Sequence, residues 1–344
     1  MPSLLDKNER PSNLPVDVKS LFLEKAARLH FNRYPDPDYR ELRDRLSSYC
    51  GFPADRLVLG NGGDEILWMT FTSWVKPGDT VLAFSPTFSE YHRLAELFGS
   101  DFHLVPADLE GDEPVFDYEA FLRTAERLRP SLILLDTPNN PTGLSHPASF
   151  IGETVSLCES VIVVDEAYGE FAASSWLGSM RGRDLPSNVI VLKTMSKAWG
   201  LAGLRLGYAV CGEGTASALN RVRAPFNVNC LSSAAAEIAL EHSASLLAWI
   251  GDAKRDRDRF ISRVNSIYGW RAFASDANFV LVRSPFPWDT ISDFLEGIYV
   301  KRVFYPTKGG NSRCWLRVSV GEESDMDSVI TAFLRLQKEV GCHD

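Results

Sequence analysis

The sequence lacks the features that would place it in a membrane, on nucleic acid or around a structural metal. No apolar run approaches the roughly 18 residues of a transmembrane helix, and residues 1–11 carry no charged-then-apolar signal segment. No basic run offsets the net charge of −9, so nucleic acid and anionic membranes are poor candidate partners. The six cysteines form no CxxC pair, so we expect reduced thiols, no metal site and a cytoplasmic location.

The length and the order of apolar segments indicate an α/β protein with more than one unit. A chain of 344 residues exceeds the limit of about 250 to 300 residues for a single core. Short apolar runs alternate with helical segments in the middle of the chain, which predicts a mostly parallel sheet. We expect an N-terminal arm and helix (1–30) that packs with the small domain, a large α/β domain (31–235) and a small α+β domain (236–344). Residues 4–15 are polar and contain proline, so we expect no regular element there.

The stretch from Asn188 to Val210 carries the strongest chemical signal. The apolar run 189–192 predicts a buried strand, which places Lys197 just beyond its carboxyl end, the edge where open α/β sheets bind ligands. A lysine amine, the hydroxyls of Thr194 and Ser196, and the guanidinium of Arg205 together suit a phosphorylated aldehyde such as pyridoxal 5′-phosphate (PLP). This stretch alone is equally compatible with a surface lysine and an incidental arginine.

Other predicted strand ends carry residues that would complete such a site. Glycines 60, 62 and 63 precede a helix and allow backbone N–H groups to approach a phosphate. Phe88 could stack on a flat ring, and Asn140, held between two prolines, could bind a ring substituent. Asp165 at a strand end is the carboxylate that a pyridinium nitrogen needs, and Tyr168 lies three residues further on. Arg317, in a predicted strand, could grip a carboxylate. Each signal alone also fits a turn, a core aromatic, a helix cap or a surface ion pair.

The order of these segments is more specific than any one of them. GNGGDE, PTFSEY, TPNNPTG, VDEAY, TMSKAWGLAGLRLGY, RAPFNVN and WLRVSVG follow one another along the chain. In this order the sequence resembles the fold-type I PLP-dependent aminotransferases, and within them the histidinol-phosphate aminotransferase subfamily, over about residues 4–335. The resemblance implies a seven-stranded, mostly parallel sheet in the large domain, a smaller α+β C-terminal domain, and a homodimer with shared active sites.

The resemblance also implies a role for each residue. Lys197 would form the Schiff base with PLP, Asp165 would pair with the ring nitrogen, and Tyr168 and Asn140 would contact the ring's phenolic oxygen. The remaining roles are phosphate binding by Gly63, Asp64, Ser196, Arg205 and the partner subunit's Tyr34, ring stacking by Phe88, binding of the substrate carboxylate by Arg317, and proximity to the substrate for Asn8 and Asn227.

The sequence departs from the family pattern mainly where substrate would bind. Phe88 stands where tyrosine is usual, and Gly63 where serine or alanine is common. The second arginine that binds the phosphate of histidinol phosphate has no clear match, and Lys301, Arg302 and Arg313 are the candidates.

The predicted reaction moves an amino group from a phosphorylated or amino-acid amine to a 2-oxo acid. The same fold and motifs also serve threonine-phosphate decarboxylases and amino-acid cyclases or dehydratases. A non-enzymatic PLP-fold protein is a further alternative, which the intact Lys197, Asp165 and Arg205 disfavour.

Overall fold

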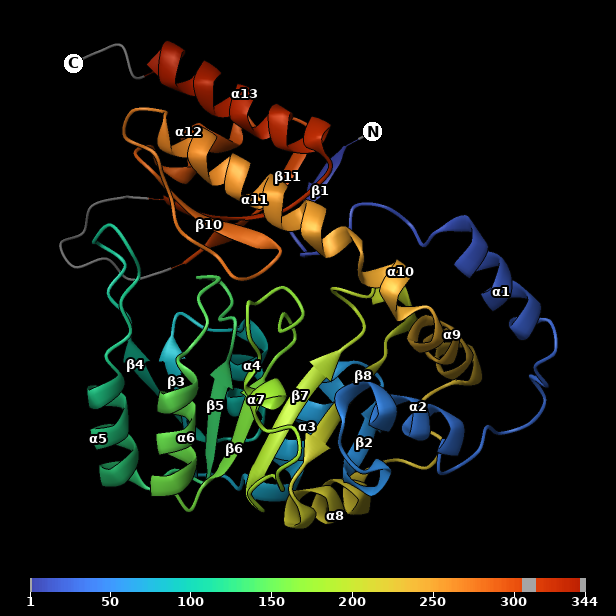
Figure 1. Cartoon of the computed structure of the whole chain (residues 1–344). Helices are drawn as coiled ribbons and strands as arrows, with labels where there is room; N and C mark the ends of the chain where they lie inside the picture. The colour runs from blue at the N-terminus through green and yellow to red at the C-terminus, as the bar shows by residue number, and fades with distance from the viewer. Residues whose placement is uncertain (1, 305–313, 341–344) are drawn as a thin grey trace.

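The computed structural model describes residues 2–304 and 314–340, so Arg313 lies outside the described residues. Within them the chain builds two sheets, a large one below and a small one above (Figure 1). The large sheet has seven described strands, in the spatial order β2 (Leu57–Gly60), β8 (Gly207–Cys211), β7 (Val189–Thr194), β6 (Val161–Asp165), β5 (Leu132–Asp136), β3 (Thr80–Ser85) and β4 (Asp101–Pro106).

The large sheet is parallel except for one strand. β4, β3, β5, β6 and β7 pair in parallel, while β8 pairs antiparallel with both β7 and β2. The predicted α/β class with a mostly parallel seven-stranded sheet is therefore confirmed. Because β5, β6 and β7 run in the same direction, the polar residues that follow them meet at one edge of the sheet.

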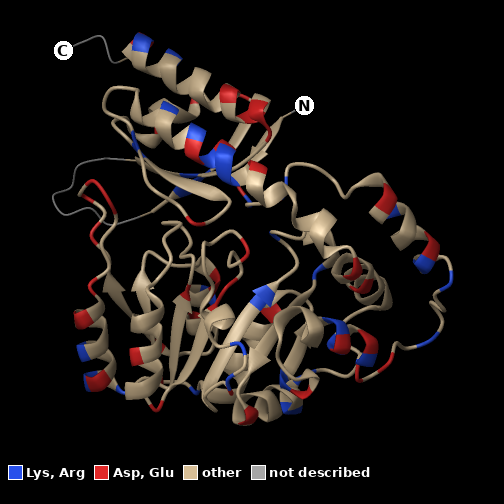
Figure 2. Ribbon diagram, viewed as in Figure 1, with Lys and Arg blue, Asp and Glu red and all other residues tan. Residues whose placement is uncertain are grey.

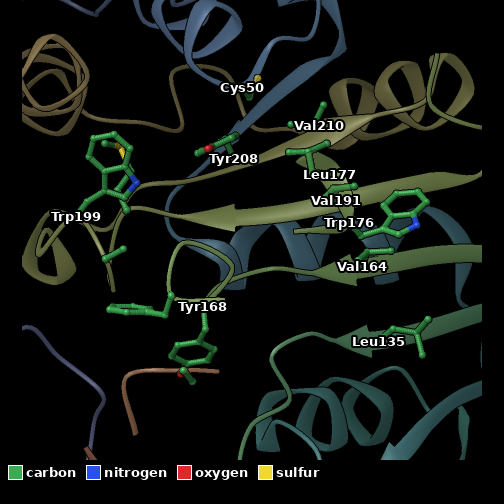
Figure 3. Close-up of a cluster of buried hydrophobic side chains, with 14 of the residues drawn as sticks. Cys50, Leu135, Val164, Tyr168, Trp176, Leu177, Val191, Trp199, Tyr208 and Val210 are labelled. Atoms are coloured by element: carbon green, nitrogen blue, oxygen red, sulfur yellow. The ribbon is translucent and has the colours of Figure 1, made fainter. Parts of the chain in front are cut away.

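Side chains alternate between two apolar layers, one on each face of the sheet. On one face, Leu135, Val164, Val191 and Val210 form a row across β5, β6, β7 and β8 (Figure 3), as the strand register requires. Each is almost completely buried, and burying one such side chain contributes roughly 1.5 to 3 kcal/mol. This packing stabilises the sheet whose strand ends carry the polar residues.

Helices cover both faces of the large sheet. One face packs against α3 (Gly63–Trp74), α4 (Ser89–Leu97) and α8 (Glu213–Val222). The other packs against α2 (Arg40–Cys50), α5 (Tyr118–Leu128), α6 (Ala148–Leu157), α7 (Trp176–Ser179) and α9 (Cys230–Glu241). Figure 2 shows the charged residues mainly on the outer helices and loops, with the central strands largely without them. Among residues 2–304 and 314–340, no helix is both long and apolar enough to cross a bilayer.

The small sheet is assembled from both ends of the chain. Its described strands follow the order β1 (Ser3–Leu5), β11 (Ile298–Val303), β12 (Cys314–Ser319), β10 (Phe279–Ser284) and β9 (Arg271–Ala272). It packs under α11 (Trp249–Asn265), α12 (Trp288–Ser292) and α13 (Glu323–Val340), and the short helix α10 (Ser243–Leu247) leads into α11. The expectation of no regular element in residues 4–15 was wrong at its start, because β1 pairs in parallel with β11.

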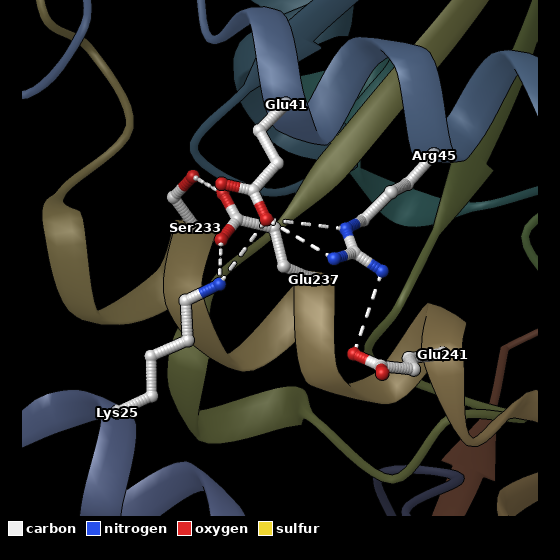
Figure 4. A network of polar contacts seen from close by, with 6 residues as sticks. All are labelled: Lys25, Glu41, Arg45, Ser233, Glu237 and Glu241. Atoms are coloured by element: carbon white, nitrogen blue, oxygen red, sulfur yellow. Dashed lines mark hydrogen bonds and ion pairs between the residues drawn. The ribbon is translucent and has the colours of Figure 1, made fainter.

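The helix α1 (Val16–Ala26) lies beside α9 rather than against the small sheet (Figure 1). Lys25 bonds to Glu237 of α9 and lies 3.5 Å from Glu41 of α2, and Arg45 joins Glu41 to Glu241 (Figure 4). Such partly exposed pairs contribute little individually, up to about 1 kcal/mol each. The first 30 residues thus contact both units, and the division of the chain at residues 30 and 235 stays a prediction.

Candidate active site

One cavity lies at the carboxyl ends of β5, β6 and β7, beside the start of α3. Nine of the predicted site residues line it together: Gly63, Asp64, Phe88, Asn140, Asp165, Tyr168, Ser196, Lys197 and Arg205. Six further residues line it, namely Leu67, Asp136, Pro138, Ala167, Leu192 and Thr194. The strand ends therefore gather the amine, the carboxylate, the hydroxyls and the guanidinium in one place.

Lys197 follows β7 and is held at the cavity by the N-terminal segment. Its Nζ donates a hydrogen bond of 2.8 Å to the backbone carbonyl oxygen of Lys7 and lies 5.9 Å from the centre of the Tyr168 ring. The amine is half-buried and, in the described part of the chain, has no carboxylate within ion-pair distance. An amine without a carboxylate partner is available to react with an aldehyde.

The start of α3 forms a cradle for an anion. The first N–H groups of a helix have no partner within the helix, and here they belong to Gly63 and Asp64. Arg205 Nη2 lies 2.8 Å from Asp64 Oδ2 at the same place. The Ser196 Oγ is buried and has no hydrogen-bond partner among the described residues. Unpaired backbone donors, a free hydroxyl and a guanidinium are the donor set that a phosphate monoester requires.

The cradle depends on a close backbone approach at Gly207. A Cβ at this position would lie 2.5 Å from the Gly63 nitrogen and 2.5 Å from the Gly62 carbonyl carbon. We expect Gly207→Ala to displace the Gly62–Gly63 turn, to destabilise the protein by about 1–3 kcal/mol and to weaken PLP binding. Urea unfolding and PLP titration of the apoprotein measure the two effects.

Gly203→Ala is the matched control, because a Cβ there meets nothing within 4 Å. Its stability and PLP affinity should stay close to those of the wild type. A Gly207→Ala protein that matched this control in both measurements would show that the turn tolerates the displacement and does not set the cradle.

Asp165, the last residue of β6, is a buried carboxylate without a cationic partner. Its Oδ2 accepts from the Tyr91 hydroxyl at 2.8 Å, and its Oδ1 accepts from the Ala167 N–H at 3.0 Å. Burial raises the pKa of Asp165 to about 6, and the Tyr91 hydrogen bond opposes this shift. No lysine or arginine in the described residues forms an ion pair with it. A protonated pyridine nitrogen would supply the missing positive charge, so this residue fits the cofactor.

Asn8 and Arg317 do not line the cavity themselves, but each forms a hydrogen bond to a residue that does. The Asn8 Nδ2 donates to the Tyr168 hydroxyl at 2.9 Å, and the Asn8 Oδ1 accepts from Ser319 Oγ at 2.9 Å. Arg317 donates to Asn140 Oδ1 at 2.6 Å and to the Asp6 carbonyl at 2.5 Å, while its buried Nε has no partner in the described chain. Burial lowers the pKa of Arg317, and a bound carboxylate would compensate its charge.

Two predicted residues are not brought to this cavity within one chain. Tyr34 is 80% exposed and stacks on Phe226, with ring centres 4.5 Å apart. Asn227 donates from its side-chain amide to the Leu59 carbonyl at 3.0 Å and to Glu65 Oε2 at 2.8 Å. Asn227 therefore supports the turn before α3 rather than facing the cavity.

Comparison with known proteins identifies the family. The model of the family "Aminotransferase class I and II" matches residues 4–333. Histidinol-phosphate aminotransferase of Caldanaerobacter subterraneus subsp. tengcongensis is 33% identical over 330 residues, which cover 95% of this chain and 91% of that protein. Histidinol-phosphate aminotransferase 1 of Burkholderia lata is 39% identical over 285 residues, covering 82% and 77% of the two chains.

Solved structures agree with this assignment. The histidinol-phosphate aminotransferase of Sinorhizobium meliloti in complex with PLP superimposes with a TM-score of 0.86 at 25% identity, covering 98% of this chain and 91% of that one. The L-threonine-O-3-phosphate decarboxylase of Porphyromonas gingivalis has a TM-score of 0.79 at 19% identity, covering 98% and 100%, and shares the fold. The chain belongs to the aminotransferase class I and II family and is a PLP-dependent aminotransferase.

Proposed function

We propose that this protein transfers an amino group from a phosphorylated amine of the histidinol-phosphate type to a 2-oxo acid, in the cytoplasm, as a step of amino-acid biosynthesis. The observation that carries the proposal is the convergence of Lys197, Asp165 and Arg205 on one cavity, with Arg317 directly behind it. The names of the relatives support the same substrate class.

PLP, when bound, supplies an electron sink that makes the Cα–H bond of the substrate amine acidic. We assign to Lys197 the covalent attachment of the cofactor and, once displaced by substrate, the transfer of a proton from Cα to C4′. Asp165 would keep the ring nitrogen protonated, with Tyr168 and Asn140 facing the phenolic oxygen and Phe88 stacking on the ring. The N–H groups of Gly63 and Asp64, with Ser196 and Arg205, would hold the cofactor phosphate.

The strand register supports Lys301 over Arg302 as the cation for a substrate phosphate, while Arg313 lies outside the described residues. Lys301 on β11 pairs with Arg317 on β12, so the two side chains share one face of the small sheet, the face on which Arg317 reaches Asn140. Arg302 pairs with Leu316 on the opposite face and lies over the rings of Trp288 and Phe304. We therefore propose Lys301, next to Arg317, as the phosphate-binding cation.

Lys301→Ala should erase the preference for phosphorylated substrate. A hydrogen bond to a charged group contributes about 1.5–3 kcal/mol, so kcat/KM for histidinol phosphate should fall about 10- to 100-fold, and that for histidinol should barely change. Arg302→Ala is the control and should keep the preference. Equal rates with and without phosphate in the wild type would reject the phosphate site and favour an amino-acid donor.

We also propose a homodimer in which Tyr34 of the partner subunit completes each site. Support comes from Tyr34, an exposed aromatic residue on a loop stiffened by Pro35 and Pro37, whose ring stacks on the half-buried Phe226. Lys197→Ala and Tyr34→Phe proteins, refolded together, should form heterodimers with one doubly damaged site and one intact site. Activity above both parents is the expected result. A monomer by light scattering would refute the sharing of sites.

A further inference from the structure

Asp136 ends β5 as Asp165 ends β6, and the two residues are partners in the strand register. Both lie two residues beyond apolar side chains, Leu134 and Val163, that pack on the α3 and α4 face, so both carboxyl groups point to that face. Neighbouring strands are about 4.8 Å apart, which places the two acids side by side. Each is 5% exposed, and each lines the cavity.

The Asp136 carboxylate connects two neighbouring loops that both line the cavity. Its Oδ1 accepts from Thr87 Oγ1 at 2.9 Å and from Asn139 Nδ2 at 3.0 Å, and its Oδ2 accepts from the Asn140 N–H at 2.8 Å. Thr87 immediately precedes Phe88, and Asn140 is the residue that contacts Arg317. Asp136 therefore joins the Phe88 loop to the Asn140 loop, beside a second contact in which Asn139 Nδ2 donates to the Pro86 carbonyl at 3.1 Å.

This connection carries an electrostatic cost that a neutral side chain would avoid. Burial raises the pKa of Asp136 to about 7; the charge of Asp165 adds to the rise, and the three donors oppose it. No lysine or arginine of the described chain forms an ion pair with Asp136. The carboxylate is suited to this place because both of its oxygens accept: an amide has only one acceptor oxygen, and its NH₂ group would face a donor.

We propose that Asp136 is a positioning residue that places the cofactor ring by fixing the positions of Phe88 and Asn140 relative to each other in the cavity. The proposal rests on the function proposed above, which assigns Phe88 and Asn140 to the ring. Asp136 would act on the ring through its hydrogen bonds to Thr87, which precedes Phe88, and to the Asn140 N–H.

Asp136→Asn tests the proposal with readouts of cofactor placement. The amide must leave at least one of the three donors unpaired, so the loops should separate. We expect the dissociation constant for PLP, titrated into the apoprotein, to rise at least 10-fold, and the visible circular dichroism per bound cofactor to weaken. Asp276→Asn is the matched control. Its carboxylate accepts at 3.3 Å from the N–H of Ser145, which lies on the same loop as Asn140 but does not line the cavity. It should leave both readouts unchanged.

Thr87→Val provides a milder second variant that removes a single donor from the same carboxylate. It should produce a smaller change of the same kind, and the double variant should add less than the sum, because both changes break one connection. This variant carries the test if Asp136→Asn does not fold. A lowered melting temperature of the apoprotein, with wild-type PLP affinity and circular dichroism in both variants, would overturn the proposal and leave Asp136 a structural residue. Failure of the proposed function differs: the wild type itself would then transfer no nitrogen.

Discussion

Lys197→Ala is expected to abolish transamination while leaving the fold intact. The residue is half-buried, and its only described side-chain hydrogen bond is to the Lys7 carbonyl, so truncation removes an amine and little packing. Loss of both the covalent attachment and the proton carrier should lower turnover to the limit of detection. Borohydride reduction followed by peptide mass spectrometry should find the cofactor on the wild-type peptide that contains Lys197, and no labelled peptide in the variant.

Two other lysines serve as the alternative amine and as the control for this assignment. Lys193 lies on β7 with its Nζ 3.4 Å from Glu166 and 3.1 Å from Glu170, away from the cavity. Cofactor label on Lys193, or wild-type turnover by Lys197→Ala, would show that Lys197 is not the amine that carries the cofactor. The exposed Lys76, which precedes β3 at the opposite edge of the sheet, is the control, and Lys76→Ala should keep full activity.

Asp165→Asn is expected to lower turnover on the order of 10²- to 10³-fold, the effect of breaking a buried charge pair worth about 3–5 kcal/mol. The amide keeps the shape and the hydrogen bond from Tyr91 but cannot hold the ring nitrogen protonated. Steady-state kcat and the PLP dissociation constant measure the loss. Turnover within a factor of a few of the wild type would mean that Asp165 does not face the ring nitrogen.

Asp165→Asn, which should lower turnover, should raise the stability of the apoprotein at high pH. Burial raises the pKa of Asp165 from 3.8 to about 6, so its contribution to stability is present below pH 4 and is lost as the pH rises through 6. At pH 8 the charged form costs roughly 3 kcal/mol, which the neutral amide avoids. Urea unfolding without cofactor should therefore favour Asp165→Asn over the wild type more at pH 8 than at pH 4.5. A pH-independent difference would contradict the shifted pKa.

The sequence predicted the site best where a buried strand ends in a polar residue. The runs 161–164 and 189–192 are apolar throughout, because those strands are covered on both faces, and Asp165 and Lys197 follow them. β4 shows no continuous buried apolar run, because Asp101 and His103 interrupt it and Val105 is its one buried residue, so the pattern does not predict a strand there. β1 is three residues long, and its partner β11 lies almost 300 residues away, which no local pattern can reveal.

Other features depended on tertiary contacts. The segment 232–267 reads as one helical region, but it folds as α9, α10 and α11, which have no glycine or proline at the breaks near His242 and Ala248. Asn227 lies in a family motif, yet its amide is occupied by Leu59 and Glu65. Asp136 follows the apolar run 132–135, and only its register with Asp165 distinguishes it from a helix cap or a turn residue.

The fate of the substrate nitrogen tests the central claim most directly. Purified holoenzyme is mixed with one equivalent of ¹⁵N-labelled histidinol phosphate without a 2-oxo acid, and the released cofactor is analysed by mass spectrometry. We predict one ¹⁵N per active site in the cofactor within a single turnover, and its passage into glutamate when 2-oxoglutarate is added. The same measurement is made in parallel with threonine phosphate, aromatic amino acids and arginine derivatives. Transamination would be contradicted if the label stayed with the donor in every case. It would also be contradicted if any of these amino acids released CO₂.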